Sequence, residues 1–240
     1  MKALILAAGK GKRLNGVLGG MNKCMTEVSG KPIIEWVLGN IARTEKISEV
    51  VIVVGYKAED IISRIGSNYM NLNIKYVVQK EQKGVVNAIE CAKDEIGLED
   101  FLLLLGDEFM ISPRHVEMIN HFYRKEYFSL LGSVIVDNKE HIKKTYTFEF
   151  NSNGEVTHLV EKPENPLNNY MGTGNIFFNH SIFDYIQSTP INPVRGEKEL
   201  VDLIRTAIND KRKVGYFQIS SFYLNLNTIE EFTEIKCMNL

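Results

Sequence analysis

The chain opens with an apolar run that leads straight into a basic, glycine-rich loop, Leu6-Ala7-Ala8-Gly9-Lys10-Gly11-Lys12-Arg13-Leu14. Residues 2–7, which are apolar after Lys2, predict a buried β-strand, and the glycines predict a tight turn after it. Glycine lets a backbone approach a phosphate closely, and arginine adds a fork of donors suited to phosphate oxygens. The stretch therefore predicts a phosphate-binding loop, with a tight surface turn bearing solvated lysines as the alternative.

The loop matches neither of two common nucleotide-binding patterns. It lacks the GxGxxG spacing of a Rossmann dinucleotide site and the GxxxxGK spacing, followed by Ser or Thr, of an ordinary NTPase. In an open α/β sheet, ligands bind at the carboxyl ends of the strands, which is where this loop is expected. We therefore expect a nucleotide site of another kind and disfavour a NAD-dependent oxidoreductase.

Outward from this loop, apolar strands alternate with amphipathic helices. The first half predicts strands at 2–7, 50–54, 74–78 and 101–105, and helices that begin at Pro32, Gly84 and Ser112. Such alternation is typical of βαβ units, and unbroken apolar strands fit a sheet covered on both faces. The fold class predicted is α/β with a mostly parallel sheet.

The second half is richer in strands. Strands are expected at 130–136, 145–150, 156–160 and 175–178, and helices at 181–187, 197–209 and 228–236. The sequence contains no repeat and no low-complexity linker. We therefore expect a single domain over 1–240, with a nucleotide-binding half at about 1–128 and an acceptor-binding half at about 129–240.

Composition narrows the classes of function. The 240 residues carry a formal net charge of −2, and the one short basic run, residues 211–213, follows a predicted helix, so no nucleic-acid surface is indicated. The three cysteines form no CxxC pair, which argues against a disulfide framework or a zinc site. No apolar stretch approaches the ~20 residues that span a bilayer. We expect a cytoplasmic protein without membrane or nucleic-acid partners, for which a homo-oligomer is one option.

The loop resembles the LAAGxGTRL motif of the sugar-phosphate nucleotidyltransferases, the family of glucose-1-phosphate thymidylyltransferase and related NDP-sugar pyrophosphorylases. Lys12 stands where that family usually has threonine, and Lys23 follows Arg13 by the family's ten residues, with Asn22 in place of a proline. The resemblance implies a Rossmann-like, mixed central sheet of the nucleotide-diphospho-sugar transferase type, with helices on both faces. It also implies catalytic roles for Arg13 and Lys23, which would neutralise a triphosphate.

The family's base-reading segment resembles residues 79–84. The resemblance implies that Gln79 pairs with the edge of a pyrimidine and that Gly84 lets the backbone close on the ring, which favours UTP or dTTP. The nucleotide-binding residues implied in all are Leu6, Ala8, Gly9, Gly11, Lys12, Arg13, Gln79 and Gly84.

Two further motifs imply a metal site. The run Leu102–Asp107 is similar to the family's LLLGD, and residues 223–232 resemble WxDIGTPEDY, with Asn225 at the usual aspartate. Mg²⁺ prefers one or two carboxylates together with phosphate oxygens and waters. The resemblance therefore implies Mg²⁺ as cofactor, Asp107 and Asn225 as metal ligands, and Asp107 as a third catalytic residue.

The acceptor side is implied by two motifs in the second half. Glu161 and Lys162 belong to an EKP motif, and Thr173 and Gly174 to a stretch similar to INTGIYxF. In the family these residues bind the sugar and its phosphate. Thr147 and Gly172 depart from the family pattern at positions where they could narrow or reshape the acceptor pocket.

These motifs together predict an enzyme that condenses a nucleoside triphosphate with a sugar 1-phosphate to give an NDP-sugar and pyrophosphate. Its partners would be the NTP and a phosphorylated small molecule. Three alternatives stay open: a cytidylyltransferase acting on a non-sugar phosphate or phosphonate such as phosphocholine, a GTP-using guanylyltransferase, and a non-catalytic nucleotide-sugar sensor.

Overall fold

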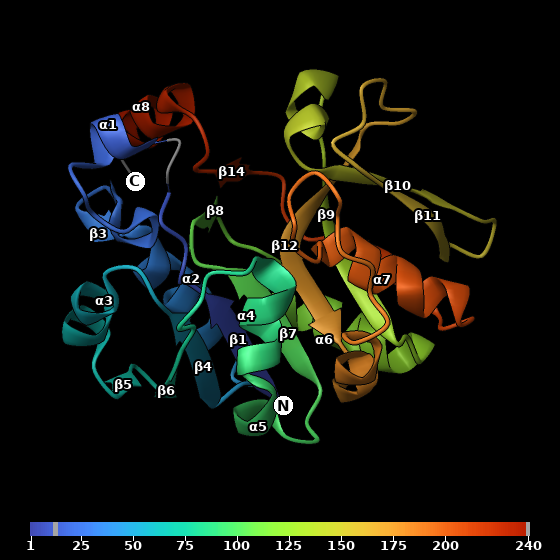
Figure 1. Ribbon diagram of the computed structural model, residues 1–240, viewed down its shortest axis with the longest axis horizontal. Helices are drawn as coiled ribbons and strands as arrows, with labels where there is room; N and C mark the ends of the chain where they lie inside the picture. The colour runs from blue at the N-terminus through green and yellow to red at the C-terminus, as the bar shows by residue number, and fades with distance from the viewer. Residues whose placement is uncertain (12–13, 239–240) are drawn as a thin grey trace.

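The structure is a computed structural model that describes residues 1–11 and 14–238, so the predicted site residues Lys12 and Arg13 lie outside the described residues. Four parallel strands form its first half, in the order β7-β1-β4-β6 (Figure 1). Their bounds are β1 (Lys2–Leu6), β4 (Glu49–Val54), β6 (Leu72–Val78) and β7 (Phe101–Leu105). Because the strands are parallel, their carboxyl ends meet at one edge of the sheet.

The second half extends the same sheet with mainly antiparallel pairs. β12 pairs antiparallel with β7 and with β9, which joins the two halves without a break. These added strands are β9 (Ser129–Ile135), β10 (Tyr146–Phe150), β11 (Val156–Glu161), β12 (Tyr170–Phe178) and β13 (Val214–Gln218), and β5 (Asn68–Tyr69) pairs with β6 at the other end. The expected mixed central sheet is confirmed, with parallel pairing concentrated in its first half.

Helices cover both faces of the sheet. Ala3 and Ile5 of β1 face one core, whereas Leu4 and Leu6 face the other, as the alternation of a strand requires. The first core is covered by α2 (Ile33–Ala42), α3 (Ala58–Ile65), α6 (His115–Lys125) and α8 (Ile229–Cys237), and the second by α4 (Val85–Cys91), α5 (Lys93–Ile96), α7 (Leu200–Asn209) and η4 (His180–Tyr185). Each fully buried large aliphatic side chain stabilises this arrangement by ~1.5–3 kcal/mol.

Several local predictions differ from the structure. The helix expected at 181–187 is the 3₁₀ helix η4, and the helix expected from Gly84 is split into α4 and α5. Neither α3 nor β13 was expected. The N-cap residue of α3 is Lys57, which has a left-handed conformation and gives no side-chain cap, so the segment lacks the usual N-cap signal of a helix start.

Short elements complete the edge where the parallel strands end. β8 (Glu108–Met110) follows β7 almost directly and pairs antiparallel with β14 (Tyr223–Asn225), which brings the C-terminal segment to this edge. The remaining short elements are α1 (Asn15–Leu18), η2 (Lys23–Met25), β2 (Glu27–Val28), β3 (Lys31–Pro32) and η3 (Lys139–Lys144). Among the described residues, no helix is long and apolar enough to cross a membrane.

Candidate functional site

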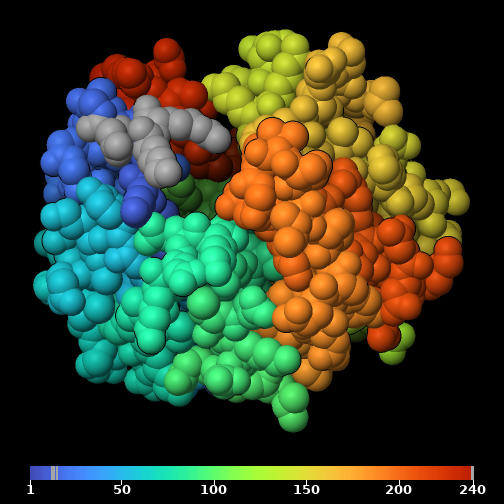
Figure 2. Space-filling model, in the orientation of Figure 1, coloured from blue at the N-terminus to red at the C-terminus, as the bar shows by residue number. Residues whose placement is uncertain are grey.

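A cleft of about 330 Å³ lies at the carboxyl ends of β1, β6 and β7. Such a volume falls at the lower end of small-molecule sites. In Figure 2 the hollow lies between the N-terminal segments and the orange segment that precedes α7. The cleft is lined by Leu6, Ala7, Ala8, Gly9, Gly11, Lys23, Cys24, Gln79, Gln82, Gly84, Val85, Ala88, Leu105, Asp107 and Glu197. Every described residue predicted to bind the nucleotide is in this lining.

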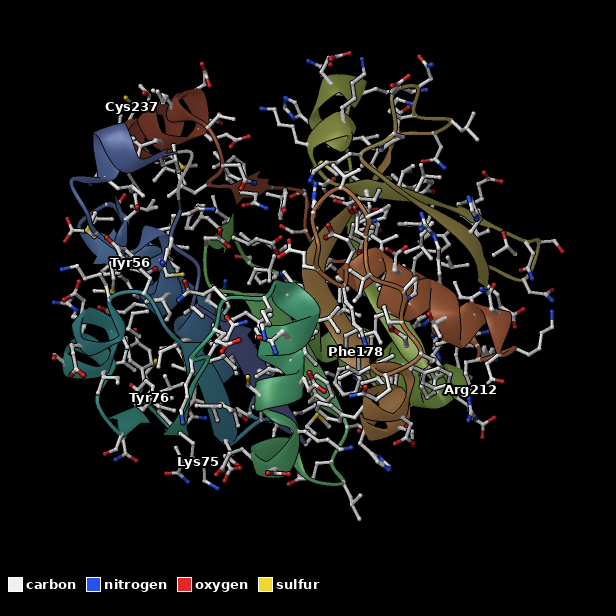
Figure 3. The ribbon with its side chains drawn as sticks, viewed as in Figure 1. Tyr56, Lys75, Tyr76, Phe178, Arg212 and Cys237 are labelled. Atoms are coloured by element: carbon white, nitrogen blue, oxygen red, sulfur yellow. The ribbon has the colours of Figure 1, made fainter. Side chains whose placement is uncertain are left out.

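The loop after β1 is held in place by Asn22, which is fully buried. Its Nδ2 donates to the carbonyls of Ala7 at 3.0 Å and Tyr56 at 2.8 Å, and its Oδ1 accepts from the amide of Cys24. Tyr56, labelled in Figure 3, also donates its hydroxyl to the carbonyl of Gly20 at 3.0 Å. An asparagine at the family's proline position thus ties the loop to the neighbouring strand connection, a role that sequence reasoning missed.

Gly11 permits a close approach between this loop and Lys23. A Cβ at Gly11 would lie only 2.6 Å from Cγ of Lys23, and the residue has a φ of +60°. The lysine stem therefore passes directly over the glycine, which only a missing side chain allows.

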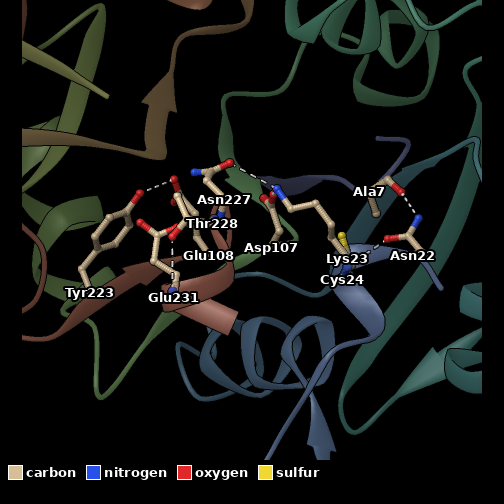
Figure 4. Close-up of polar contacts among 10 residues, drawn as sticks. All are labelled: Ala7, Asn22, Lys23, Cys24, Asp107, Glu108, Tyr223, Asn227, Thr228 and Glu231. Atoms are coloured by element: carbon tan, nitrogen blue, oxygen red, sulfur yellow. Dashed lines mark hydrogen bonds and ion pairs between the residues drawn. The ribbon is translucent and has the colours of Figure 1, made fainter. Parts of the chain in front are cut away.

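Lys23 and Asp107 form an ion pair in the cleft, although they lie far apart in the sequence (Figure 4). Nζ of Lys23 also donates to Oδ1 of Asn227 at 3.3 Å. The side chains of Lys23 and Asp107 are 13% and 21% exposed, so their charges are only partly screened by solvent. The structure brings together a cation and a carboxylate beside a glycine-rich loop, a set that can hold a phosphate chain and a divalent cation.

The side chains of Asp107 and Asn225 fit a magnesium site. The amide of Leu226 donates to the carbonyl of Asp107 at 3.2 Å, and Asn225 is paired with Glu108 in the β8–β14 ladder. Oδ1 of Asn225 is buried and has no hydrogen-bond partner among the described residues. A buried oxygen without a partner is costly unless a ligand satisfies it. Asn225 lines a second cavity together with Tyr223 and Asn227, whereas Asp107 lines the cleft. An amide oxygen and a carboxylate are both among the oxygen donors that Mg²⁺ takes.

Gln79 is almost fully buried and its amide is fixed in one orientation. Nε2 donates to the carbonyl of Gly84 at 3.1 Å and to Oδ1 of Asn87 at 2.9 Å. A backbone carbonyl only accepts, so the amide cannot be turned round without losing this bond. Both N–H groups are thereby used, and Oε1 is the part of the amide left to meet a ligand.

The predicted acceptor residues lie outside the cleft lining. Glu161 is the last residue of β11, and Lys162 follows it and forms an ion pair of 3.3 Å with it. Burial raises the pKa of Glu161, and Lys162 opposes that rise. The hydroxyl of Thr173 donates to the carbonyl of Gly132 at 3.0 Å within the sheet. The amide of Gly174 donates to the carboxyl group of Glu108.

The two departures from the family pattern on the acceptor side, Thr147 and Gly172, have structural reasons. The hydroxyl of Thr147 lies 2.9 Å from Oδ1 of Asn168 and 2.7 Å from the carbonyl of Tyr170. A Cβ at Gly172 would lie 2.1 Å from the ring of Tyr146, so a side chain there is excluded by packing.

Two carboxylates near the site were not among the predicted site residues. Glu197 reaches the cleft from the acceptor half, and its carboxylate packs against Gly84. Glu108 is buried beneath the cleft, and burial raises its pKa to about 7 against the lowering effect of Tyr223 and Gly174. Glu197 lies in a stretch that resembles a family motif, GExELTD, so the sequence did contain a signal for it.

The family model for nucleotidyl transferases matches residues 2–237. The chain belongs to the nucleotidyl transferase family. UTP–glucose-1-phosphate uridylyltransferase AglF of Haloferax volcanii is 34% identical to it over 236 residues, covering 98% of this chain and 94% of that protein. The predicted family is thus confirmed.

Other relatives of this nucleotidyl transferase are longer. Glucose-1-phosphate thymidylyltransferase of Streptomyces griseus is 28% identical, and the match covers 98% of this chain and 65% of that protein. The bifunctional protein GlmU of Methanocaldococcus jannaschii is 29% identical, and the match covers 48% of its length. A solved structure of UDP-glucose pyrophosphorylase complexed with UDP-glucose superposes with a TM-score of 0.85 at 23% identity, covering 98% of this chain and 96% of that one. The superposition confirms the predicted fold type.

Proposed function

We propose that this nucleotidyl transferase condenses UTP or dTTP with a sugar 1-phosphate, giving an NDP-sugar and pyrophosphate. The observation that carries the proposal is the convergence of the glycine loop, Lys23, Asp107 and Gln79 on one cleft. The names of the uridylyltransferase and thymidylyltransferase relatives support the same reaction.

The reaction is an in-line displacement at the α-phosphorus. An oxygen of the acceptor's phosphate forms a bond to this phosphorus, the bond to the β-phosphate oxygen breaks, and pyrophosphate leaves. The attacking phosphate is already ionised, so no general base is needed. The chain's work is to bring two polyanions together, and Lys23 with the amides of the loop after β1 would hold the triphosphate. Arg13 and Lys12, by resemblance, would add to this set, and Glu161, Lys162, Thr173 and Gly174 would form the acceptor side.

Asp107 and Asn225 would hold Mg²⁺, one through a charged oxygen and the other through its unpartnered amide oxygen. When bound there, the ion would neutralise phosphate charge and help to orient the α-phosphate. Mg²⁺ would compete with Lys23 for Asp107, and the triphosphate would compete with Asp107 for Lys23. Lys23 would therefore turn from Asp107 toward the phosphates.

The fixed amide of Gln79 favours uracil and thymine over cytosine. Uracil and thymine carry an N–H at position 3, which Oε1 can accept, whereas cytosine presents a bare acceptor nitrogen there. With cytosine, Oε1 would face another acceptor, and a buried polar group would stay unsatisfied. This would cost ~1–3 kcal/mol, which corresponds to about five- to 150-fold in affinity for the nucleotide. Guanine also carries an N–H group that can donate to Oε1. This geometry therefore argues against the cytidylyltransferase alternative in particular.

The test is a panel of UTP, dTTP, CTP and GTP against sugar 1-phosphates and phosphocholine, scored by pyrophosphate release with and without Mg²⁺. We expect Mg²⁺-dependent release with UTP or dTTP and a sugar 1-phosphate. Faster release with CTP and phosphocholine would contradict the proposal. Nucleotide binding without turnover on every acceptor would instead favour a nucleotide-sugar sensor.

A further inference from the structure

A buried carboxyl group lies directly behind the candidate metal ligands. Glu108 is only 3% exposed, and hydrogen-bond donors reach both of its oxygens. Oε1 accepts from the amide of Gly174 at 2.8 Å and from the hydroxyl of Tyr223 at 2.8 Å. Oε2 accepts from Nδ2 of Asn175 at 3.0 Å and again from the Gly174 amide at 3.0 Å. Both oxygens of the Glu108 carboxyl group therefore act as hydrogen-bond acceptors.

The β12 segment that meets Glu108 is shaped for this contact. The register of β12 against β9 shifts between Gly172 and Ile176, so the amide of Gly174 is turned out of the regular ladder. A Cβ at Gly174 would lie 2.3 Å from Cγ of Leu105 and 3.0 Å from Oε1 of Glu108. Only a residue without a side chain lets this amide come so close to the carboxyl.

A second layer fixes the partner amide. Nε2 of His115, at the start of α6, lies 2.8 Å from Oδ1 of Asn175. Since that oxygen only accepts, the imidazole donates through Nε2, and Nδ2 of Asn175 is left to face Glu108. The contact therefore has one arrangement of donors and acceptors in which every bond is made.

The same carboxyl group connects to both candidate metal ligands through the backbone. Glu108 follows Asp107 directly and pairs with Asn225 in the β8–β14 ladder. Tyr223, which donates to Glu108, is the first residue of β14 and lies two positions before Asn225. Figure 4 shows Tyr223 and Glu108 on one side of Asp107, with Lys23 on the other.

We propose that Glu108 is a positioning residue, which joins the Asp107 and Asn225 segments to the bulge of β12 and so fixes the metal-ligand pair relative to the acceptor half. The proposal rests on the proposed function for the identity of the metal site. Its structural content does not depend on that function, because it concerns which segments the carboxyl group holds together.

Two variants remove the contact in different ways. Tyr223→Phe deletes one donor and keeps the ring, whereas Glu108→Gln places an N–H group where a donor already points. We expect both variants to bind Mn²⁺ about tenfold more weakly in the presence of UTP without acceptor, measured from the free Mn²⁺ signal in electron paramagnetic resonance. We also expect kcat to fall about tenfold while KM for UTP stays within about twofold.

The matched control is Tyr185→Phe, which likewise removes a tyrosine hydroxyl that contacts a carboxylate, here the partly buried contact with Asp210 far from the cleft. Its thermal midpoint should fall by a similar amount with Mn²⁺ binding and kcat unchanged. Equal metal binding and equal kcat in Tyr223→Phe, Glu108→Gln and the control would overturn the proposal.

Hydrogen exchange separates this proposal from the function on which it rests. In Tyr223→Phe and Glu108→Gln, the amides of Gly174 and Leu226 should exchange about tenfold faster than in the wild type and in Tyr185→Phe. Unchanged exchange would overturn the positioning role even for an active enzyme. If the wild type neither turned over nor bound Mn²⁺ with UTP, the proposed function would fail, and the exchange rates would still decide whether Glu108 positions these segments.

Discussion

The ion pair between Lys23 and Asp107 gives a direct test of how the cleft handles charge. Lys23→Met keeps most of the stem that passes over Gly11 and removes only the ammonium group. The ammonium group of Lys23 and a phosphate charge about 4 Å from it would attract each other by ~4 kcal/mol at an effective dielectric constant of 20. If this attraction acts in the transition state, it corresponds to about a thousandfold in rate. Loss of one preorganised charged donor elsewhere costs ~10²–10³ in turnover. We therefore expect kcat to fall by about 10²–10³ in the NTP panel reaction, measured by pyrophosphate release.

The Mg²⁺ concentration for half-maximal rate should respond to this substitution differently from kcat. Without Lys23, Asp107 loses the cation that competes with the metal, so the Mg²⁺ concentration for half-maximal rate should not rise. The control is Lys93→Met, an exposed lysine at the start of α5, which lies near the amino ends of the parallel strands (Figure 1). The reasoning is refuted if Lys23→Met retains a rate within fivefold of the wild type, or if Lys93→Met loses as much.

Three further predictions concern the base, the metal and pH. Gly84 has a φ of +90°, and a Cβ there would lie 2.7 Å from Oε2 of Glu197; Gly84→Ala should raise KM for UTP by about five- to 150-fold, from ~1–3 kcal/mol of backbone strain. Adding Glu197→Ala to Gly84→Ala should reverse only the part of the KM increase that comes from the clash with Glu197. Full reversal would show that backbone strain at position 84 plays no role. Asn225→Asp should lower the Mg²⁺ concentration for half-maximal rate roughly tenfold, because it places a charge at the unpartnered oxygen; an unchanged requirement would remove Asn225 from the metal site. Burial lowers the pKa of His115 from 6.5 to about 4, so its contribution to stability is present above pH 6.5 and is lost as the pH falls through 4. The free energy of unfolding, measured with urea, should therefore fall by roughly 3 kcal/mol less in His115→Gln than in the wild type between pH 7 and pH 4. An equal fall in both proteins would contradict the pKa assignment.

The sequence was informative where the signal is local. The run into Gly9 and Gly11 predicted both a strand and a phosphate loop, because apolar periodicity and glycine content are properties of neighbouring residues. Asp107 was proposed as a site residue because residues 102–107 resemble a family motif, which is also a pattern of neighbouring residues. The parallel first half of the sheet could likewise be expected, because strands that alternate with helices are typical of βαβ units. The mixed character of the whole sheet was implied by the family resemblance.

What only the tertiary structure decided involves residues brought together by the register of the sheet. The ion pair of Lys23 with Asp107, the approach of Glu197 to Gly84, and the contact of Glu108 with Gly174 each join segments that no local pattern relates. Their distances are set by strand pairing and by the burial of both cores. The sequence by itself determined which chemical groups the chain can offer to a nucleotide. The packing of the sheet decided which of them face the cleft, because a one-residue change of register turns a side chain to the opposite face.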